Sequence, residues 1–165
     1  MNPELPLFIY GHSMGATIVL SYLMLNPSVK VAGLIVSAPP TGMNHNLNPV
    51  MKFLVKHVVS DMWEFLFTTG ISHTQVSEWR DVQNRFLTDW YCAPVLGGPQ
   101  VGFFGKMLYD FKYNAHLLKV PTYVHYGTSD VVVSIPHLKQ FYEWLKCEKK
   151  FTEYENARHE LHTDR

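Results

Sequence analysis

Two short apolar runs, separated by one helix-length segment, constrain the fold of this chain more than any other feature. The first run, Leu7–Tyr10, stops at Gly11, and the following segment 13–26 is apolar almost all round until Pro27 ends it. The second run, Val31–Ala38, is again continuously apolar. Such runs are typical of strands in a parallel sheet, so we expect a right-handed β-α-β unit whose first strand is buried on both faces.

The middle of the chain, from Thr41 to about Leu118, predicts helices and no buried strand. A Gly/Pro-rich segment, Pro94–Gly105, predicts a flexible loop ahead of a last helix around Lys106–Leu118. We expect this insert to lie over the carboxyl ends of the strands and to cover a pocket with its aromatic side chains. The apolar residues at helical spacing are Val50, Phe53, Leu54, Val58, Phe65 and Leu66, then Val76, Trp79, Val82, Phe86 and Leu87.

The alternation of strand and helix returns in the last third of the chain. Thr122–Tyr126 and Phe151–Tyr154 predict strands, and a helix that Ser134 opens runs to about Lys146 between them. The predicted fold class is therefore α/β, with parallel β-α-β units and a helical insert between the second and third strands. One structural domain then divides into three segments: 1–40, 41–118 and 119–165.

The composition argues against nucleic acid as a partner and favours a reducing compartment. Fourteen Lys and Arg balance fourteen Asp and Glu among 165 residues, so the chain offers no net charge for nucleic acid. Cys92 and Cys147 have neither disulfide-framework nor zinc spacing, which favours a reducing compartment. The run that ends at Tyr10 is no signal peptide, and no uncharged run approaches the roughly 18 residues that span a bilayer. We expect a cytoplasmic protein, with association at a membrane surface as the further possibility.

The turn after the first predicted strand has the pattern G-x-S-x-G, with the sequence G-H-S-M-G at Gly11–Gly15. A position between strand and helix is what a nucleophile elbow requires, because a strained turn there projects the serine hydroxyl from the sheet. Gly11 and Gly15 would be needed because neighbouring backbones pass close by. Ser13 would be the nucleophile, and the backbone N–H of Met14 would be one oxyanion donor. The alternative is a glycine-bounded turn with a surface serine.

Two later loops contain a candidate acid and a candidate base. Asp130 follows the third predicted strand and His159 follows the fourth, and the carboxyl ends of parallel strands meet at one edge of a sheet. The chain order Ser13, Asp130, His159 is one that hydrolase triads use. His159 would take the proton from Ser13, and Asp130 would fix the imidazole tautomer.

Each of these assignments leaves an alternative open. Asp130 could be an Asx-turn residue instead, and His162 competes with His159 as the base. His12 is expected to face a different direction from the serine, and His125 is expected to be a core residue with satisfied nitrogens. The sequence H-E-L-H that ends at His162 has one residue too few for the zinc motif H-E-x-x-H, and no third ligand is evident. We therefore predict no metal and no cofactor.

Four segments resemble the α/β-hydrolase superfamily, in particular its monoacylglycerol lipase and lysophospholipase group, also described as serine aminopeptidase S33 or hydrolase-4. G-H-S-M-G, a later G-x-x-D and A-R-H-E-L carry this likeness. The resemblance implies Ser13 as nucleophile, Asp130 as acid, His159 as base and the Met14 N–H as oxyanion donor. The similar segments are Pro6–Ala16, Ala32–Pro39, Val120–Val131 and Asn156–Leu161.

The chain also departs from the pattern of this family. Similar proteins have several strands and two helices before the elbow, with an H-G-x-G-like loop that supplies a second oxyanion donor, and a closing helix at the carboxyl end. We therefore expect a C-terminal portion of a hydrolase, truncated at both ends relative to the family. One long apolar sheet edge should then be unpaired.

The resemblance implies a serine hydrolase that cleaves acyl esters, with monoacylglycerol or lysophospholipid as the expected substrate. Transient contact with a membrane surface would run through the apolar insert. Two alternatives stay open: a catalytically impaired remnant that acts only as a binding or subunit piece, and an S33-type aminopeptidase. The sequence makes no prediction of oligomeric state.

Overall fold

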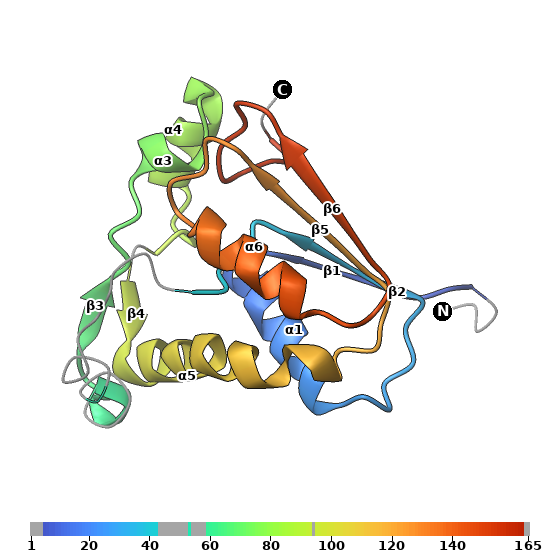
Figure 1. Ribbon diagram of the computed structural model, residues 1–165. Helices are drawn as coiled ribbons and strands as arrows, with labels where there is room; N and C mark the ends of the chain where they lie inside the picture. Colours follow the sequence, from blue (N-terminus) through green and yellow to red (C-terminus); the bar gives the residue numbers. More distant parts are fainter. Residues whose placement is uncertain (1–4, 43–52, 54–58, 94, 164–165) are drawn as a thin grey trace.

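The computed structural model describes residues 5–42, 53, 59–93 and 95–163 of the chain (Figure 1). In these residues the core is a four-stranded sheet of order β1-β2-β5-β6, in which every neighbouring pair is parallel. Helix α1 (Met14–Leu25) joins β1 to β2, and α6 (Ile135–Trp144) joins β5 to β6. The predicted fold class is confirmed. The strands are β1 (Phe8–His12), β2 (Gly33–Ser37), β5 (Thr122–Gly127) and β6 (Lys149–Tyr154).

The hydrophobic core lies between this sheet and helices on one of its faces. Figure 1 shows α1, α6 and the end of α5 (Gly98–Asn114) on the same side of the strands. Alternate strand residues point at these helices, so Val36 and Val124 are fully buried. Leu20 of α1 and Phe141 of α6 are buried against the same cluster. The buried residues of the strands and of the helices therefore form one hydrophobic core.

Strand β1 differs from its prediction. Phe8 and Tyr10 are 57% and 52% exposed, so the expectation of a strand buried on both faces is wrong. The cause is the alternation of a strand: α1, α5 and α6 cover one face, while these two side chains point to the other. β1 is also the edge strand of the sheet among the described residues. The unpaired apolar edge that a truncation would leave stays a prediction.

The described part of the segment between β2 and β5 holds several short helices, the longer helix α5 and one small two-stranded ribbon. The ribbon pairs β3 with β4 in antiparallel fashion, so Leu66, which was expected to be helical, lies in a strand. Val50, Leu54 and Val58 fall outside the described residues. Helix α4 agrees with the second predicted helical group. The described elements are η1 (Val59–Asp61), β3 (Leu66–Thr68), α3 (His73–Val76), α4 (Arg80–Thr88), β4 (Val95–Gly97), α5 and η2 (Ala115–Leu117).

The predicted flexible loop over 94–105 is wrong, because α5 already begins at Gly98. Pro99 stands in the first turn of this helix, where a missing N–H costs no hydrogen bond. A Cβ on Gly98 would lie 2.3 Å from the carbonyl oxygen of Val59 and 2.4 Å from that of Met62. Gly98 therefore allows the start of α5 to approach the backbone of Val59 and Met62 closely. The Gly/Pro-rich composition of this segment is typical of a loop, so it did not indicate the helix.

Candidate active site

Ser13 occupies the sharp turn between β1 and α1. Its backbone has φ 51° and ψ −128°, a strained conformation for a residue with a side chain. Its N–H donates to the carbonyl oxygen of Ser37 at 2.9 Å, which ties the turn to the end of β2. A Cβ on Gly11 would lie 2.7 Å from the Cα of Ala16, as the elbow pattern requires. A Cβ on Gly15 would meet no described atom within 4 Å, so the expected crowding there is wrong.

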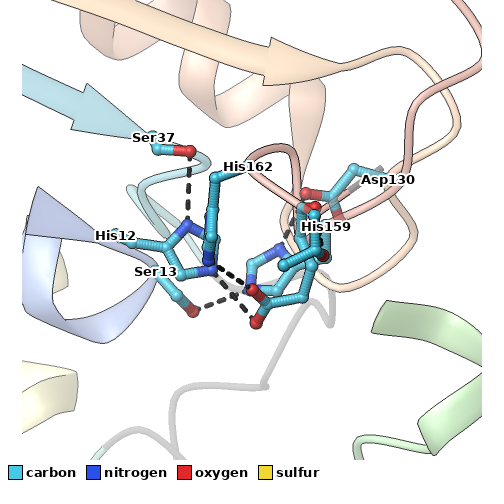
Figure 2. Close-up of polar contacts among 8 residues, drawn as sticks. His12, Ser13, Ser37, Asp130, His159 and His162 are labelled. Carbon is cyan, nitrogen blue, oxygen red and sulfur yellow. Dashed lines mark hydrogen bonds and ion pairs between the residues drawn. The ribbon is translucent and has the colours of Figure 1, made fainter. Parts of the chain in front are cut away.

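The structure brings the three sequence-predicted side chains together (Figure 2). The Oγ of Ser13 lies 2.8 Å from Nε2 of His159, and Nδ1 of the same ring lies 2.8 Å from Oδ2 of Asp130. Asp130 and His159 are 5% and 3% exposed. The pair is therefore shielded from water on the side away from the serine.

A close approach between two loops positions the acid and the base. The N–H of Ser129 donates to the carbonyl oxygen of Ala157 at 3.0 Å. A Cβ on Gly127 would lie 2.1 Å from that same oxygen, so only glycine fits at the end of β5. The loop after β5 and the loop after β6 therefore pack directly on each other.

Asp130 fits both of its sequence interpretations. Oδ1 accepts the N–H groups of Val132 and Val133 at 2.7 and 3.1 Å, which is the Asx-turn role. Oδ2 faces His159. Because a carboxylate only accepts hydrogen bonds, Nδ1 of His159 carries the proton and Nε2 presents its lone pair to the hydroxyl of Ser13. This is the tautomer that a general base needs.

Met14 opens helix α1 directly after the serine. Its backbone N–H is among the first of the helix and has no acceptor one turn earlier within it. Helix N-termini favour negative charge, and the helix follows Ser13 without a gap. The position agrees with an oxyanion donor.

His12 contacts His159 and His162, and the sequence did not predict these contacts. Its ring centroid lies 4.9 Å from that of His159 and 5.1 Å from that of His162 (Figure 2). Its Nδ1 lies 3.2 Å from Oγ of Ser37. Its Nε2 is buried, lies 3.4 Å from Oε1 of Glu160 and has no hydrogen-bond partner among the described residues. Sequence spacing gives no signal for this contact, because the two residues are at opposite ends of the chain.

Glu160 links His12 to His162. Its Oε2 lies 3.2 Å from Nε2 of His162, whose side chain is about half exposed. Burial raises the pKa of the Glu160 carboxyl, but the contact with His12 and the charges of His12, His162 and His159 hold this pKa below its usual value. One donor atom from each of His12, Glu160 and His162 lies within 4.8 Å of the others. Among the described residues this trio is the candidate for a metal ion.

His125 contradicts its prediction as a satisfied core histidine. Both ring nitrogens are buried and neither has a hydrogen-bond partner among the described residues. The ring stacks on Tyr123 with centroids 5.1 Å apart. Burial, together with the charges of His12 and His162, lowers the pKa of His125, so the ring is neutral at pH 7.

The insert holds the histidine loop from outside. The guanidinium of Arg158 pairs with Glu78 at 3.0 Å and donates to the carbonyl oxygen of Thr74. The next peptide is fixed as well, since the N–H of Glu160 donates to the carbonyl oxygen of Val76 at 2.8 Å. Residues on both sides of His159 therefore contact the segment that contains α3 and α4.

A serine on a strained strand-to-helix turn, with an aspartate and a histidine in loops after later parallel strands, defines the α/β-hydrolase class. The family model for serine aminopeptidase S33 (Hydrolase_4) matches residues 1–165. The chain therefore belongs to this family.

Curated relatives are named as monoglyceride lipases. A Schizosaccharomyces pombe protein named "Putative monoglyceride lipase" is 29% identical over 173 residues, covering 99% of this chain and 44% of that protein. A "Monoglyceride lipase homolog" from monkeypox virus is 23% identical over 98% of this chain and 58% of its own length. The chain thus spans about half the length of the curated relatives it matches.

Solved structures share the fold. A monoacylglycerol lipase from Paleococcus ferrophilus superimposes with a TM-score of 0.85 at 23% identity, over 95% of this chain and 61% of that one. A soluble variant of monoglyceride lipase from Saccharomyces cerevisiae, in complex with a substrate analog, gives a TM-score of 0.78 at 20% identity, over 94% and 55%. The resemblance of the chain to an α/β-hydrolase is confirmed.

Proposed function

We propose that this protein is a serine hydrolase of carboxylic esters. The observation that carries the proposal is the unbroken hydrogen-bonded chain from Ser13 through His159 to Asp130, with 2.8 Å at each step. In the proposed reaction the Ser13 hydroxyl attacks the ester carbonyl while His159 takes its proton. His159 returns that proton to the leaving alcohol, and Asp130 stabilises the imidazolium that forms between the two steps.

The oxyanion of the tetrahedral intermediate would face the N–H of Met14. Removal of one such donor typically costs about 10² to 10³ in turnover. The resemblance implies a second donor from a loop that precedes the elbow in similar proteins.

A monoacylglycerol or a lysophospholipid is the proposed substrate class. The names of the curated relatives support it. The insert adds physical support, because it presents large apolar side chains that suit an acyl chain or a lipid surface. No described helix has both the length and the apolar character that crossing a bilayer requires. The most exposed of these side chains are Trp90, Tyr91, Trp63, Leu66 and Leu87.

A binding or subunit role is the second candidate. The exposed side chains on β1 favour it, since Phe8 and Tyr10 form an apolar patch beside an unpaired strand edge within the described residues. In that case the chain would need a second polypeptide before Ser13 becomes reactive. An S33-type aminopeptidase is the third candidate, and only the name of the family model favours it.

Labelling with a fluorophosphonate probe tests the proposal. We expect the purified chain to react, Ser13→Ala to abolish the reaction, and Ser28→Ala, at an exposed loop serine, to leave it unchanged. A folded chain that does not label would contradict independent catalysis and favour the subunit role.

Substrate panels then separate the remaining candidates. Monoacylglycerols, lysophospholipids, short-chain aryl esters and aminoacyl arylamides are compared at equal concentration with the same two variants. Ser13-dependent release of fatty acid from a lipid supports the proposed substrate class. Cleavage of arylamides with no cleavage of lipid esters would contradict it and favour the aminopeptidase.

A further inference from the structure

Three side chains next to Ser13 take no part in the proposed reaction and still converge on one point. They are His12 at the end of β1, with Glu160 and His162 in the loop that follows His159. We propose that His12, Glu160 and His162 bind one Zn²⁺ ion. This site does not depend on the proposed function.

One donor atom from each of the three residues lies within 4.8 Å of the others. Donors about 2.1 Å from a tetrahedral zinc lie roughly 3.4 Å from one another, so the side chains draw together when the ion binds. The Glu160 carboxylate already lies between the two rings, with Oε1 3.4 Å from His12 Nε2 and Oε2 3.2 Å from His162 Nε2. Two imidazoles and one carboxylate are a ligand set that zinc uses, with a fourth position left for water.

The hydrogen bonding of His12 prepares its Nε2 for an ion. Its Nδ1 lies 3.2 Å from Ser37 Oγ, and an outer partner of this kind fixes the tautomer of a metal-binding imidazole. When Nδ1–H donates to Ser37, the lone pair of Nε2 faces the carboxylate of Glu160. Nε2 is buried and has no hydrogen-bond partner among the described residues. A cation between these two acceptors would satisfy both.

The three ligands differ in solvent exposure and in how firmly the backbone holds them. The side chain of His162 is 52% exposed, so an ion can enter from solvent. Glu160 is anchored through its backbone, because its N–H donates to the carbonyl oxygen of Val76 at 2.8 Å. His12 is fixed by its place on β1. Two anchored ligands and one exposed ligand therefore surround the point of convergence.

Calorimetry on the metal-stripped 165-residue chain without a histidine tag tests the site directly. We expect one Zn²⁺ per chain, binding about tenfold or more weaker in His162→Asn and in Glu160→Gln, and unchanged binding in His116→Asn, an exposed histidine elsewhere. Co²⁺ serves as a second probe, because a tetrahedral site gives intense visible absorption that His162→Asn should remove. Equal Zn²⁺ affinity in the wild type and in both ligand variants would overturn the site.

Discussion

Ser13 comes from the exposed edge of the sheet, whereas Asp130 and His159 come from two loops packed on each other. On the first side, Tyr10 is 52% exposed and Met14 is 41% exposed. On the second side, Asp130 and His159 are almost completely buried, and the insert holds the peptides next to His159. The contacts within the described residues therefore preorganise the acid and base more strongly than the nucleophile.

Substitutions on the two sides of the site should therefore have different effects. A substitution near Asp130 or His159 should alter proton transfer or stability, because both side chains are buried and hydrogen-bonded. A substitution on the open face of β1 should alter association and leave the site intact.

Asp130→Asn should have the largest effect on reactivity. The amide keeps the shape of the carboxylate and can still accept from Val132 and Val133, but it no longer holds the His159 tautomer with a negative charge. We expect the labelling rate of Ser13 to fall by about 10⁴-fold. The control is Asp81→Asn in the exposed first turn of α4. A fall of less than about tenfold would show that the buried side does not limit reactivity.

Gly127→Ala should have the largest effect on stability. The new Cβ would lie 2.1 Å from the carbonyl oxygen of Ala157 and 2.6 Å from that of Arg158, and backbone atoms cannot move aside cheaply. We expect a loss of about 3 kcal/mol in the free energy of unfolding by urea. Gly15→Ala is the matched change on the open side, where no described atom is crowded. It should stabilise α1 by up to about 1 kcal/mol, and equal losses in both variants would contradict the comparison.

Much of this contrast could not be predicted from the sequence. The elbow at Ser13 and the loops of Asp130 and His159 were predictable, because strand ends and glycines mark them locally. The exposure of Phe8 and Tyr10 was not, since an apolar run does not say which face a helix covers. The start of α5 at Gly98 was missed because its glycine permits a close contact in three dimensions while indicating a loop in sequence.

The same reason explains the missed side of the candidate site. His12 and Glu160 meet only because β1 and the loop after β6 end at one edge of the sheet. Spacing along the chain tests ligands within one segment, such as Glu160 and His162, and cannot detect a partner from the other end. The unsatisfied nitrogens of His125 likewise depend on its neighbours in space.

Tyr10→Lys tests whether the exposed face of β1 promotes self-association. A lysine on an exposed edge strand discourages pairing with another chain, so self-association should weaken. The free energy of unfolding should change by no more than about 0.5 kcal/mol, because the side chain is half exposed. Sedimentation velocity over a range of concentrations measures the first effect, and urea unfolding measures the second. Tyr109→Lys, at an exposed position on α5, is the control, and equal effects of both variants would show that the β1 edge is not special.

Tyr126→Phe should have the smallest effect and probes the packed side away from the reacting atoms. The Tyr126 hydroxyl donates to Oε1 of Glu153 at 2.5 Å, and Lys139 lies 2.8 Å from the same oxygen. The hydrogen bonds from Lys139 and then from Tyr126 lower the pKa of the exposed Glu153 carboxyl.

Loss of the hydroxyl should therefore raise the pKa of Glu153 towards its ordinary value, while Lys139 keeps it lowered. A carboxyl whose pKa is lowered by folding stabilises the protein above its unfolded pKa, and that stability disappears as the pH falls through the folded pKa. The difference in stability between wild type and variant should accordingly be present at neutral pH and shrink in acid. A carboxyl NMR titration measures the pKa, and an unchanged value would refute the expected role of the hydroxyl. Slower labelling of Ser13 in this variant would instead show that strand packing before the loops, and not only the loop contacts at Gly127 and Ala157, positions Asp130 and His159.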